Sequence, residues 1–168
     1  MANTDLTAQQ AREIFDYNPE TGVFTRKANT RGKYNSGRTA GIEHNEGYFS
    51  LCANGKKYLA HRVAWLHVTG EWPKADIDHI NGNRADNRFE NLRDVSRSVN
   101  LQNRRSPKKT SSSRFLGVSF SKHKKDNPWV AQIKTGGKIH NLGYFSTEEA
   151  AHEAYLRKKR EVHEGCTI

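Results

Sequence analysis

Residues Asp78–Asn100 read Asp-His-Ile-Asn-Gly-Asn-Arg-Ala-Asp-Asn-Arg-Phe-Glu-Asn-Leu-Arg-Asp-Val-Ser-Arg-Ser-Val-Asn. An isoleucine flanks the Asp-His doublet on each side, a pattern that predicts a short strand. The Asn-Gly-Asn sequence that follows favours a turn, because both residue types tolerate positive φ. Phe89–Val95 predicts a second strand or extended segment, and Ser96 is a suitable N-cap for a helix over residues 97–105. The predicted order is strand, loop, strand and helix, with polar groups meeting at one end.

This stretch resembles the HNH nucleases, whose active site is the ββα-metal fold. The resemblance rests on the Asp78-His79 doublet, the Asn91-Leu92 pair and Asn100 on the following helix. The spacing is like that of phage intron-associated members, in which the third position is Asn rather than His. The resemblance implies a metal-dependent DNA endonuclease of homing type, from a phage or mobile element, that recognises a long site with partial sequence tolerance.

The residue types at these positions suit phosphodiester hydrolysis. Hard cations bind oxygen ligands, and the Asp78 carboxylate and the Asn100 amide oxygen qualify, so we expect Mg²⁺ with Mn²⁺ as a substitute. His79 is the natural general base, because imidazole titrates near neutral pH. Asn91 is either a residue that positions the loop carrying His79 or an ordinary turn asparagine. Neighbours on a regular strand face opposite sides, so the resemblance implies a twist that lets Asp78 and His79 share one target.

Basic residues are unevenly distributed along the chain. Its 168 residues carry a formal net charge of +10, and residues 102–168 hold fourteen Lys/Arg against six Asp/Glu. This pattern is expected of a protein that binds a polyphosphate such as double-stranded DNA, although a basic, merely soluble surface is the alternative. Within the loop of the motif, Arg84 and Arg88 are candidate DNA-binding residues, because arginine often contacts phosphate.

Cysteine usage and hydropathy argue against several protein classes. Cys52 and Cys166 form no CxxC motif, so neither a zinc ribbon nor a structural disulfide is expected. The N-terminus has no apolar signal-peptide core, and no apolar run approaches the roughly 18 residues of a membrane span. We therefore expect a cytoplasmic protein, in the host cell if phage-encoded, with no membrane and no small-molecule cofactor.

The N-terminal 60 residues predict a small β-rich region. We expect a helix over residues 5–18 capped by Thr4 or Asp5, then a turn and a strand from Val23. Residues 26–41 are either a solvated loop or a DNA-contacting arm. The Asn54-Gly55 pair predicts a hairpin, which either enters a major groove or forms a structural wall. Residues 61–68 predict a helix that ends at Gly70.

The C-terminal part predicts a separate module after a basic linker. The linker region contributes the candidate DNA-binding residues Arg104, Arg105, Lys108 and Lys109. Three strands and a helix capped by Thr147 then follow. This order resembles the AP2/ERF DNA-binding domain, through Gly117-Val118, the Trp-Val-Ala-Gln-Ile run, Leu-Gly-Tyr-Phe and the Glu-Glu-Ala-Ala helix start. The resemblance implies that the sheet face opposite the helix enters the major groove. By strand alternation, Ser119, Ser121, Gln132 and Lys134 are the candidate contacts on that face, and Arg114 is a further candidate DNA-binding residue.

The sequence therefore predicts an α+β protein with a ββα-metal HNH core. Four segments are expected: a helix and β-rich region over 1–60, the HNH core over 61–105, a basic linker over 106–113 and an AP2/ERF-like domain over 114–168. One site per chain favours a monomer that nicks one DNA strand. Two rivals remain: a non-catalytic AP2-like DNA-binding regulator, and a structural RNA-binding protein, against which the absence of an RRM, KH or dsRBD signature weighs.

Overall fold

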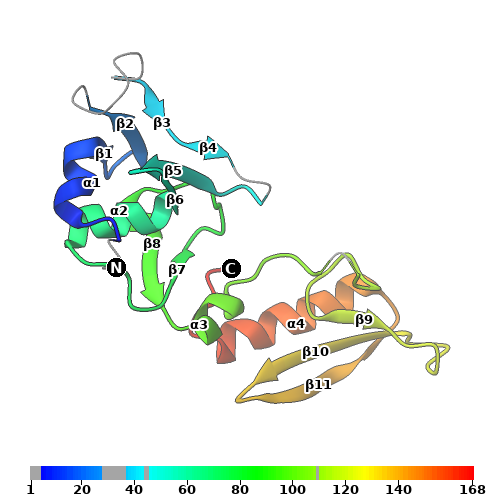
Figure 1. Ribbon diagram of the computed structural model, residues 1–168. Coiled ribbons are helices and arrows are strands. Elements are labelled where there is room, and N and C mark those ends of the chain that lie inside the picture. The colour runs from blue at the N-terminus through cyan, green and yellow to red at the C-terminus, as the bar shows by residue number, and fades with distance from the viewer. Residues whose placement is uncertain (1–4, 28–36, 44–45, 109) are drawn as a thin grey trace. The chain divides into compact units, whose positions relative to one another are not determined.

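The computed structural model describes residues 5–27, 37–43, 46–108 and 110–168. The chain divides into two compact units, Met1–Arg97 and Ser98–Ile168. Each unit combines small antiparallel sheets with helices, so the predicted α+β class is confirmed (Figure 1). No helix among the described residues is long and apolar enough to cross a membrane.

In its described residues, the first unit contains three small sheets and the helices α1 and α2. The sheets have the strand orders β1-β2-β3, β4-β5-β6 and β7-β8. The elements, in chain order, are α1 (Ala8–Ile14), β1 (Phe15–Asn18), β2 (Val23–Arg26), β3 (Thr39–Ala40), β4 (Ile42–Glu43), β5 (Phe49–Ala53), β6 (Lys56–Leu59), α2 (Ala60–Thr69), β7 (Asp76–His79), the 3₁₀ turn η1 (Phe89–Asn91) and β8 (Leu92–Val95). Helix α3 (Arg97–Gln102) begins at the last residue of this unit.

The predicted first helix was wrong at both ends. Its N-cap is Thr7, which forms a capping box with Gln10, so neither Thr4 nor Asp5 caps it. The helix ends at Ile14, because Phe15–Asn18 pairs with β2 as a strand and buries Phe15 in the core. The region predicted as a loop or arm over 26–41 lies partly outside the described residues, and Thr39–Ala40 within it forms β3.

Two predicted elements next to the site are confirmed. Asn54 and Gly55 have φ of 50° and 77° and join β5 to β6 in a two-residue turn, whose paired positive φ matches the twist of the two strands. Helix α2 ends at Gly70 in the left-handed conformation, and the Gly70 N–H donates to the Leu66 carbonyl. One prediction was too simple: the segment expected as a second strand starts with η1, so β8 begins only at Leu92.

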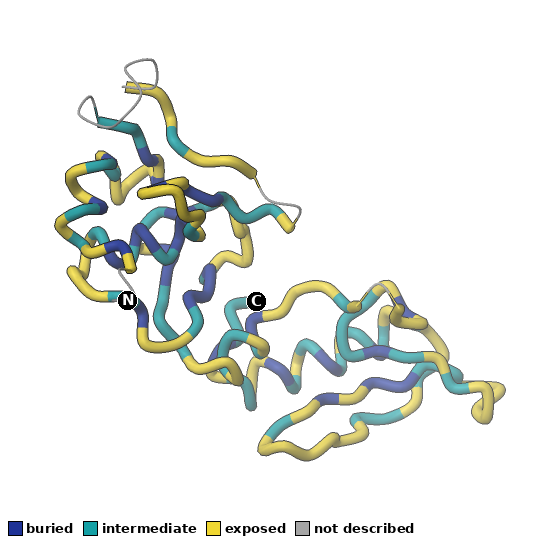
Figure 2. The backbone as a smooth tube through the Cα atoms, viewed as in Figure 1, coloured by how far each residue is buried: buried dark blue, intermediate teal, exposed yellow. Residues whose placement is uncertain are grey.

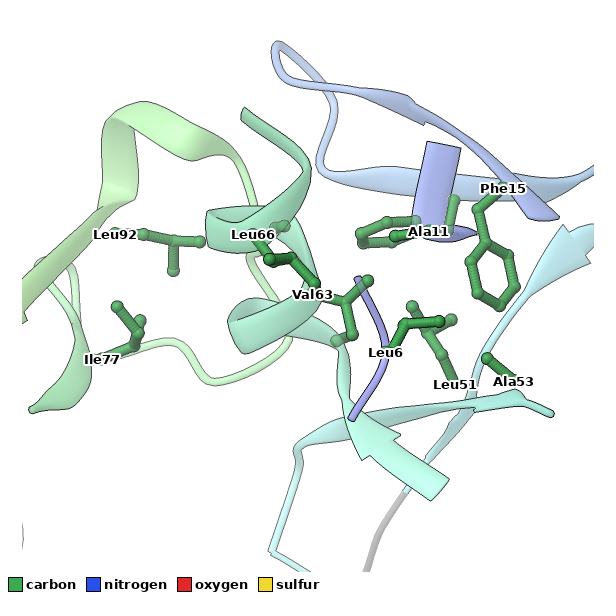
Figure 3. Close-up of a cluster of buried hydrophobic side chains, with 12 residues drawn as sticks. Leu6, Ala11, Phe15, Leu51, Ala53, Val63, Leu66, Ile77 and Leu92 are labelled. Carbon is green, nitrogen blue, oxygen red and sulfur yellow. The ribbon is translucent and has the colours of Figure 1, made fainter. Parts of the chain in front are cut away.

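Hairpin β7-β8 is attached to the core through one of its faces. Figure 3 shows Ile77 and Leu92 beside Leu66 of α2, within a cluster that also includes Val63 and Phe15. All five side chains are almost fully buried. Since Ile77 and His79 are two residues apart on β7, His79 faces the same side.

The second unit is a three-stranded sheet covered on one face by a helix. Its strands are β9 (Val118–Phe120), β10 (Trp129–Thr135) and β11 (Lys138–Phe145), in the order β11-β10-β9, and its helix is α4 (Glu148–Val162). Buried and exposed residues alternate along most of β10 (Figure 2). Ala131 and Ile133 pack with Ala151 and Tyr155 of α4, so Gln132 and Lys134 lie on the opposite, exposed face. Thr147 caps α4 as predicted, by accepting a hydrogen bond from the Ala150 N–H.

The basic residues directly after α3 contact helix α4 and the C-terminal residues of the same unit. Lys159 is 1% exposed, and its Nζ donates to the carbonyl of Arg104. Arg105 donates from Nη2 to the hydroxyl of Thr167 at 2.8 Å. These contacts hold the residues that directly precede the predicted linker, and the role of residues 106–113 as a basic linker remains a prediction.

Candidate functional site

Asp78 and His79 project from opposite faces of β7. The ladder pairs Asp78 with Arg93 and His79 with Leu92, and residues directly opposite in an antiparallel pair share a face. His79 therefore faces the core with Leu92, and Asp78 faces the other side with Arg93. The register stays regular to the end of β7, so the twist implied by the resemblance is not seen between these two residues.

Arg93 holds the Asp78 carboxylate. Its Nε and Nη2 donate to the same oxygen, Oδ2 of Asp78, at 2.9 and 2.7 Å. The Asp78 side chain is 7% exposed and that of Arg93 is 25% exposed, so water screens this ion pair only in part. Arg93 was not predicted, because only the strand register, which pairs Asp78 with Arg93 across the hairpin, identifies it.

Three side chains surround the His79 ring. The ring of His61, from α2, lies 5.1 Å away in an edge-to-face arrangement, and the ring of Tyr48 lies 5.9 Å away. His79 Nε2 is 3.4 Å from Oδ1 of Asn87, a long hydrogen bond. Burial lowers the pKa of His79, while the Asn87 contact and the carboxylates of Asp78 and Asp86 oppose that shift. The net effect of these surroundings is a pKa below the ordinary value for histidine.

His61, near the start of α2, lies against the candidate base His79. Its ring is 5% exposed, and its buried Nδ1 has no hydrogen-bond partner among the described residues. Burial, with a smaller contribution from the positive charges of His79 and Arg62, lowers its pKa to about 3. A single histidine at the start of a helix offers no sequence signal for this contact, which depends on how α2 packs against β7.

Asn91 closes the loop between β7 and β8. Its Oδ1 accepts from the Asn81 N–H at 2.9 Å, and its Nδ2 donates to the Asp86 carbonyl at 2.8 Å. Asn91 is 4% exposed, so both bonds are shielded from water. These two bonds join the end of the loop to its start and its middle, as expected of a residue that positions it. Its role in catalysis remains a prediction.

Residues 17–22, at the turn between β1 and β2, contact the loop that joins β7 to β8. The Tyr17 hydroxyl donates to the Asn87 carbonyl at 2.7 Å, and the Phe89 N–H donates to the Pro19 carbonyl at 3.0 Å. Gly22, with φ of 71°, lies so close that an added Cβ would be 2.5 Å from the Arg88 nitrogen. A glycine is therefore required at this approach.

The two loop arginines, Arg88 and Arg84, already interact with acidic side chains of the protein. Arg88 binds both oxygens of Asp86 and also Glu90, and its hydrogen bonds are the main cause that lowers the pKa of Asp86 to about 2. Arg84 lies over the Tyr48 ring, 4.7 Å from its centroid, and donates to Glu46 at 3.3 Å. A DNA phosphate would have to compete with these acidic partners.

The remaining predicted residues lie in the second unit. Asn100 lies on α3 and is half-buried, so its pairing with Asp78 as a metal ligand remains a prediction. Arg114 pairs with Glu148 and Glu149, and its guanidinium lies over Phe115. Ser119 and Ser121 are half-buried, while the fully exposed candidates are Arg104, Arg105, Lys108, Gln132 and Lys134. Lys109 lies outside the described residues.

The structure offers few protein ligands for a cation. Within the described parts of the chain, no three His, Cys, Asp or Glu side chains are grouped so that they could hold a metal ion. The predicted donor set is one carboxylate and one amide oxygen, which suits Mg²⁺, an ion that keeps several waters and binds through one or two carboxylates and substrate phosphates.

Comparison with known proteins assigns the region around this hairpin. The family described as HNH endonuclease matches residues 58–102, which include α2, β7, η1, β8 and α3. Protein 3.8 of Escherichia phage T7 is 33% identical over 104 residues, which are 61% of this chain and 83% of that protein. The chain belongs to the family of T7 protein 3.8. It carries an HNH endonuclease domain, as the sequence motif predicted, and a phage relative agrees with the predicted phage association.

A solved structure is also similar to part of the HNH-containing chain. It is described as showing DNA binding and cleavage by the HNH homing endonuclease I-HmuI, with 25% identity and a TM-score of 0.41. The similarity covers 53% of this chain and 50% of that protein, so the chain spans about half the length of this relative.

Proposed function

We propose that the protein is a metal-dependent endonuclease of homing type that hydrolyses phosphodiester bonds in double-stranded DNA and nicks one strand. The observation that carries this proposal is the HNH family match over hairpin β7-β8, whose loop Asn91 closes beside the Asp78-His79 doublet. The net charge of +10 supports a nucleic-acid substrate, and one HNH motif per chain supports a monomer that cuts one strand.

Asp78 and Asn100 are the residues that would hold the cation, Mg²⁺ or Mn²⁺. Both offer oxygen atoms, which hard cations prefer. When bound, the cation stabilises negative charge on the phosphate and on the leaving oxygen. His79 would accept the proton of the attacking water, with its ring held by Asn87 and packed against His61. Asn91 would hold the loop that carries these groups.

The second unit would supply most of the DNA affinity. Its exposed sheet face carries Gln132 and Lys134. The residues that precede this sheet in the sequence include three more exposed basic side chains, Arg104, Arg105 and Lys108. Such a mixture of basic and amide side chains serves both phosphate and base contacts. We propose that this face enters a groove of the duplex, in the manner of an AP2/ERF domain, with Ser119, Ser121 and Arg114 along its edge.

A plasmid-nicking assay tests the proposal. Supercoiled DNA, including DNA from a related phage, is incubated with the full chain and Mg²⁺, with and without EDTA. We expect relaxed circles from wild type with metal, and none with EDTA or with His79→Gln. His152→Gln is the control, because His152 is a partly buried histidine of the second unit that contacts the Leu116 carbonyl instead. Equal cleavage by His79→Gln and wild type would remove His79 from the mechanism.

A non-catalytic DNA-binding regulator is the second candidate. The observation that favours it is that His79 is 4% exposed and faces away from Asp78, which is itself bound by Arg93. This candidate predicts tight, salt-sensitive binding to duplex DNA with no cleavage at any Mg²⁺ or Mn²⁺ concentration.

A further inference from the structure

Two ion pairs lie on the outer face of hairpin β7-β8, and they differ in strength. Asp78 is bound by Arg93 through hydrogen bonds of 2.9 and 2.7 Å, whereas the Nη1 atom of Arg97 lies 3.1 Å from Oδ2 of Asp76. The Asp78 side chain is 7% exposed and that of Asp76 is 33% exposed. Charge-assisted bonds that are shielded from water are the strong ones, so the Arg93 pair is the one that affects what else can bind its carboxylate.

Arg93 occupies one of the two carboxylate oxygens of Asp78. Each carboxylate oxygen offers two lone pairs, and Oδ2 of Asp78 receives both the Nε–H and the Nη2–H of Arg93. A divalent cation bound to this carboxylate would also lie within a few ångström of the guanidinium, and at that separation two like charges repel strongly. Cation binding at Asp78 and the observed position of Arg93 are therefore in competition.

We propose that Arg93 is the exchange partner of Asp78: it neutralises the carboxylate in the free protein, and it must leave Asp78 when a divalent cation binds. This inference rests on the proposed function only in taking Asp78 as a cation ligand. The released guanidinium lies next to the cation and can donate in fork geometry to the phosphate that enters with it. Arg93 thereby keeps the free protein from binding cations tightly in the absence of DNA.

A Mn²⁺ titration of the full chain, followed by electron paramagnetic resonance without DNA, tests the exchange. Arg93→Gln removes the charged partner that donates two hydrogen bonds to Asp78. We therefore expect this variant to bind Mn²⁺ roughly tenfold or more tightly than wild type. Arg97→Gln is the matched control, since it removes the neighbouring ion pair, and its Mn²⁺ affinity should equal that of wild type. Asp78→Asn should abolish the gain in the double variant.

A second variant covers the case in which Arg93→Gln does not fold. Arg93→Lys keeps one positive charge but cannot form the fork, so its Mn²⁺ affinity should fall between those of wild type and Arg93→Gln. Unchanged or weaker Mn²⁺ binding in every folded Arg93 variant would overturn the proposal, as would an equal gain in Arg97→Gln.

The nuclease assay is run separately, so the two proposals can fail independently. If wild type nicks DNA while Arg93 variants bind Mn²⁺ like wild type, the exchange is wrong and the nuclease stands. If no variant cleaves DNA but Mn²⁺ binding tightens as expected, the exchange stands and the nuclease does not.

Discussion

The Tyr17 hydroxyl donates a hydrogen bond of 2.7 Å to the Asn87 carbonyl, across 70 residues of sequence. Asn87 in turn contacts His79 through its side chain. The N-terminal strand β1 is therefore linked to the candidate base through a single loop residue. Burial raises the pKa of Tyr17, so its hydroxyl keeps the proton that this bond requires.

Tyr17→Phe tests this link. Loss of the hydroxyl leaves the Asn87 carbonyl without its donor and should cost about 1 kcal/mol of unfolding free energy, measured by urea denaturation. Plasmid nicking should fall more than stability accounts for, because Asn87 positions His79. Tyr58→Phe, in β6, is the control for loss of a tyrosine hydroxyl away from the loop. Full nicking activity in a stable Tyr17→Phe variant would show that the Tyr17 hydrogen bond does not affect His79.

Asn91→Ala should open the loop between β7 and β8. Two buried hydrogen bonds are lost, and the Asn81 N–H and the Asp86 carbonyl lose their partners, at a cost of about 1–3 kcal/mol for each buried group left unsatisfied. Hydrogen exchange should accelerate over residues 80–91 and remain unchanged in β10. Unchanged protection in that loop would show that other contacts hold it.

Gly22→Ala should destabilise the first unit through a clash. The added Cβ meets the Arg88 nitrogen and the Asn87 carbonyl carbon, both at 2.5 Å. Gly70→Ala is the matched control, because Gly70 has a similar positive φ of 84° but nothing within 4 Å of the added atom. Positive φ alone costs about 1 kcal/mol, so the excess loss in Gly22→Ala measures the clash. Equal melting temperatures for the two variants would contradict the close approach.

Stability should fall as the pH is lowered from neutral. Burial lowers the pKa of His61 from 6.5 to about 3 in the folded protein, so below pH 6.5 the unfolded chain takes up a proton that the folded chain does not. The stabilisation present above pH 6.5 is therefore lost toward pH 3, at about 1.4 kcal/mol per pH unit from this residue. His61→Phe should flatten the pH profile of unfolding free energy, while His140→Ala, at an exposed position, should not.

Lys134→Ala should reduce the salt dependence of duplex binding. If Lys134 contacts one phosphate, the slope of log K against log salt should decrease by about one. Lys158→Ala is the control, because Lys158 lies on α4 and pairs with Glu161. An identical slope for wild type and Lys134→Ala would show that Lys134 on the exposed sheet face contacts no DNA phosphate.

Local signals in the sequence predicted much of the fold. The Asn54-Gly55 turn, the Thr147 cap and the Asp78-His79 strand each depend on residues only a few positions apart, and all three are present. The end of the first helix was missed because pairing with β2 and burial of Phe15 outweigh helical periodicity. Propensity is a weak guide where tertiary pairing competes with it.

The motif residues were found from spacing, but their neighbours were not. Asp78, His79 and Asn91 lie on the predicted hairpin and its loop. Arg93, His61 and Tyr17 were missed because their roles come from strand register, helix packing and a hydrogen bond between distant segments. No pattern within one segment encodes such contacts.

The Tyr17–Asn87 bond also bears on the order in which the chain becomes organised. Hairpin β7-β8 joins residues close in sequence, so it can close quickly, whereas β1 must wait for a segment made much later on the ribosome. During synthesis the N-terminal strand therefore exists first without the loop it will support. A nascent chain that stops before Asn87 lacks β8 and therefore cannot form the HNH hairpin.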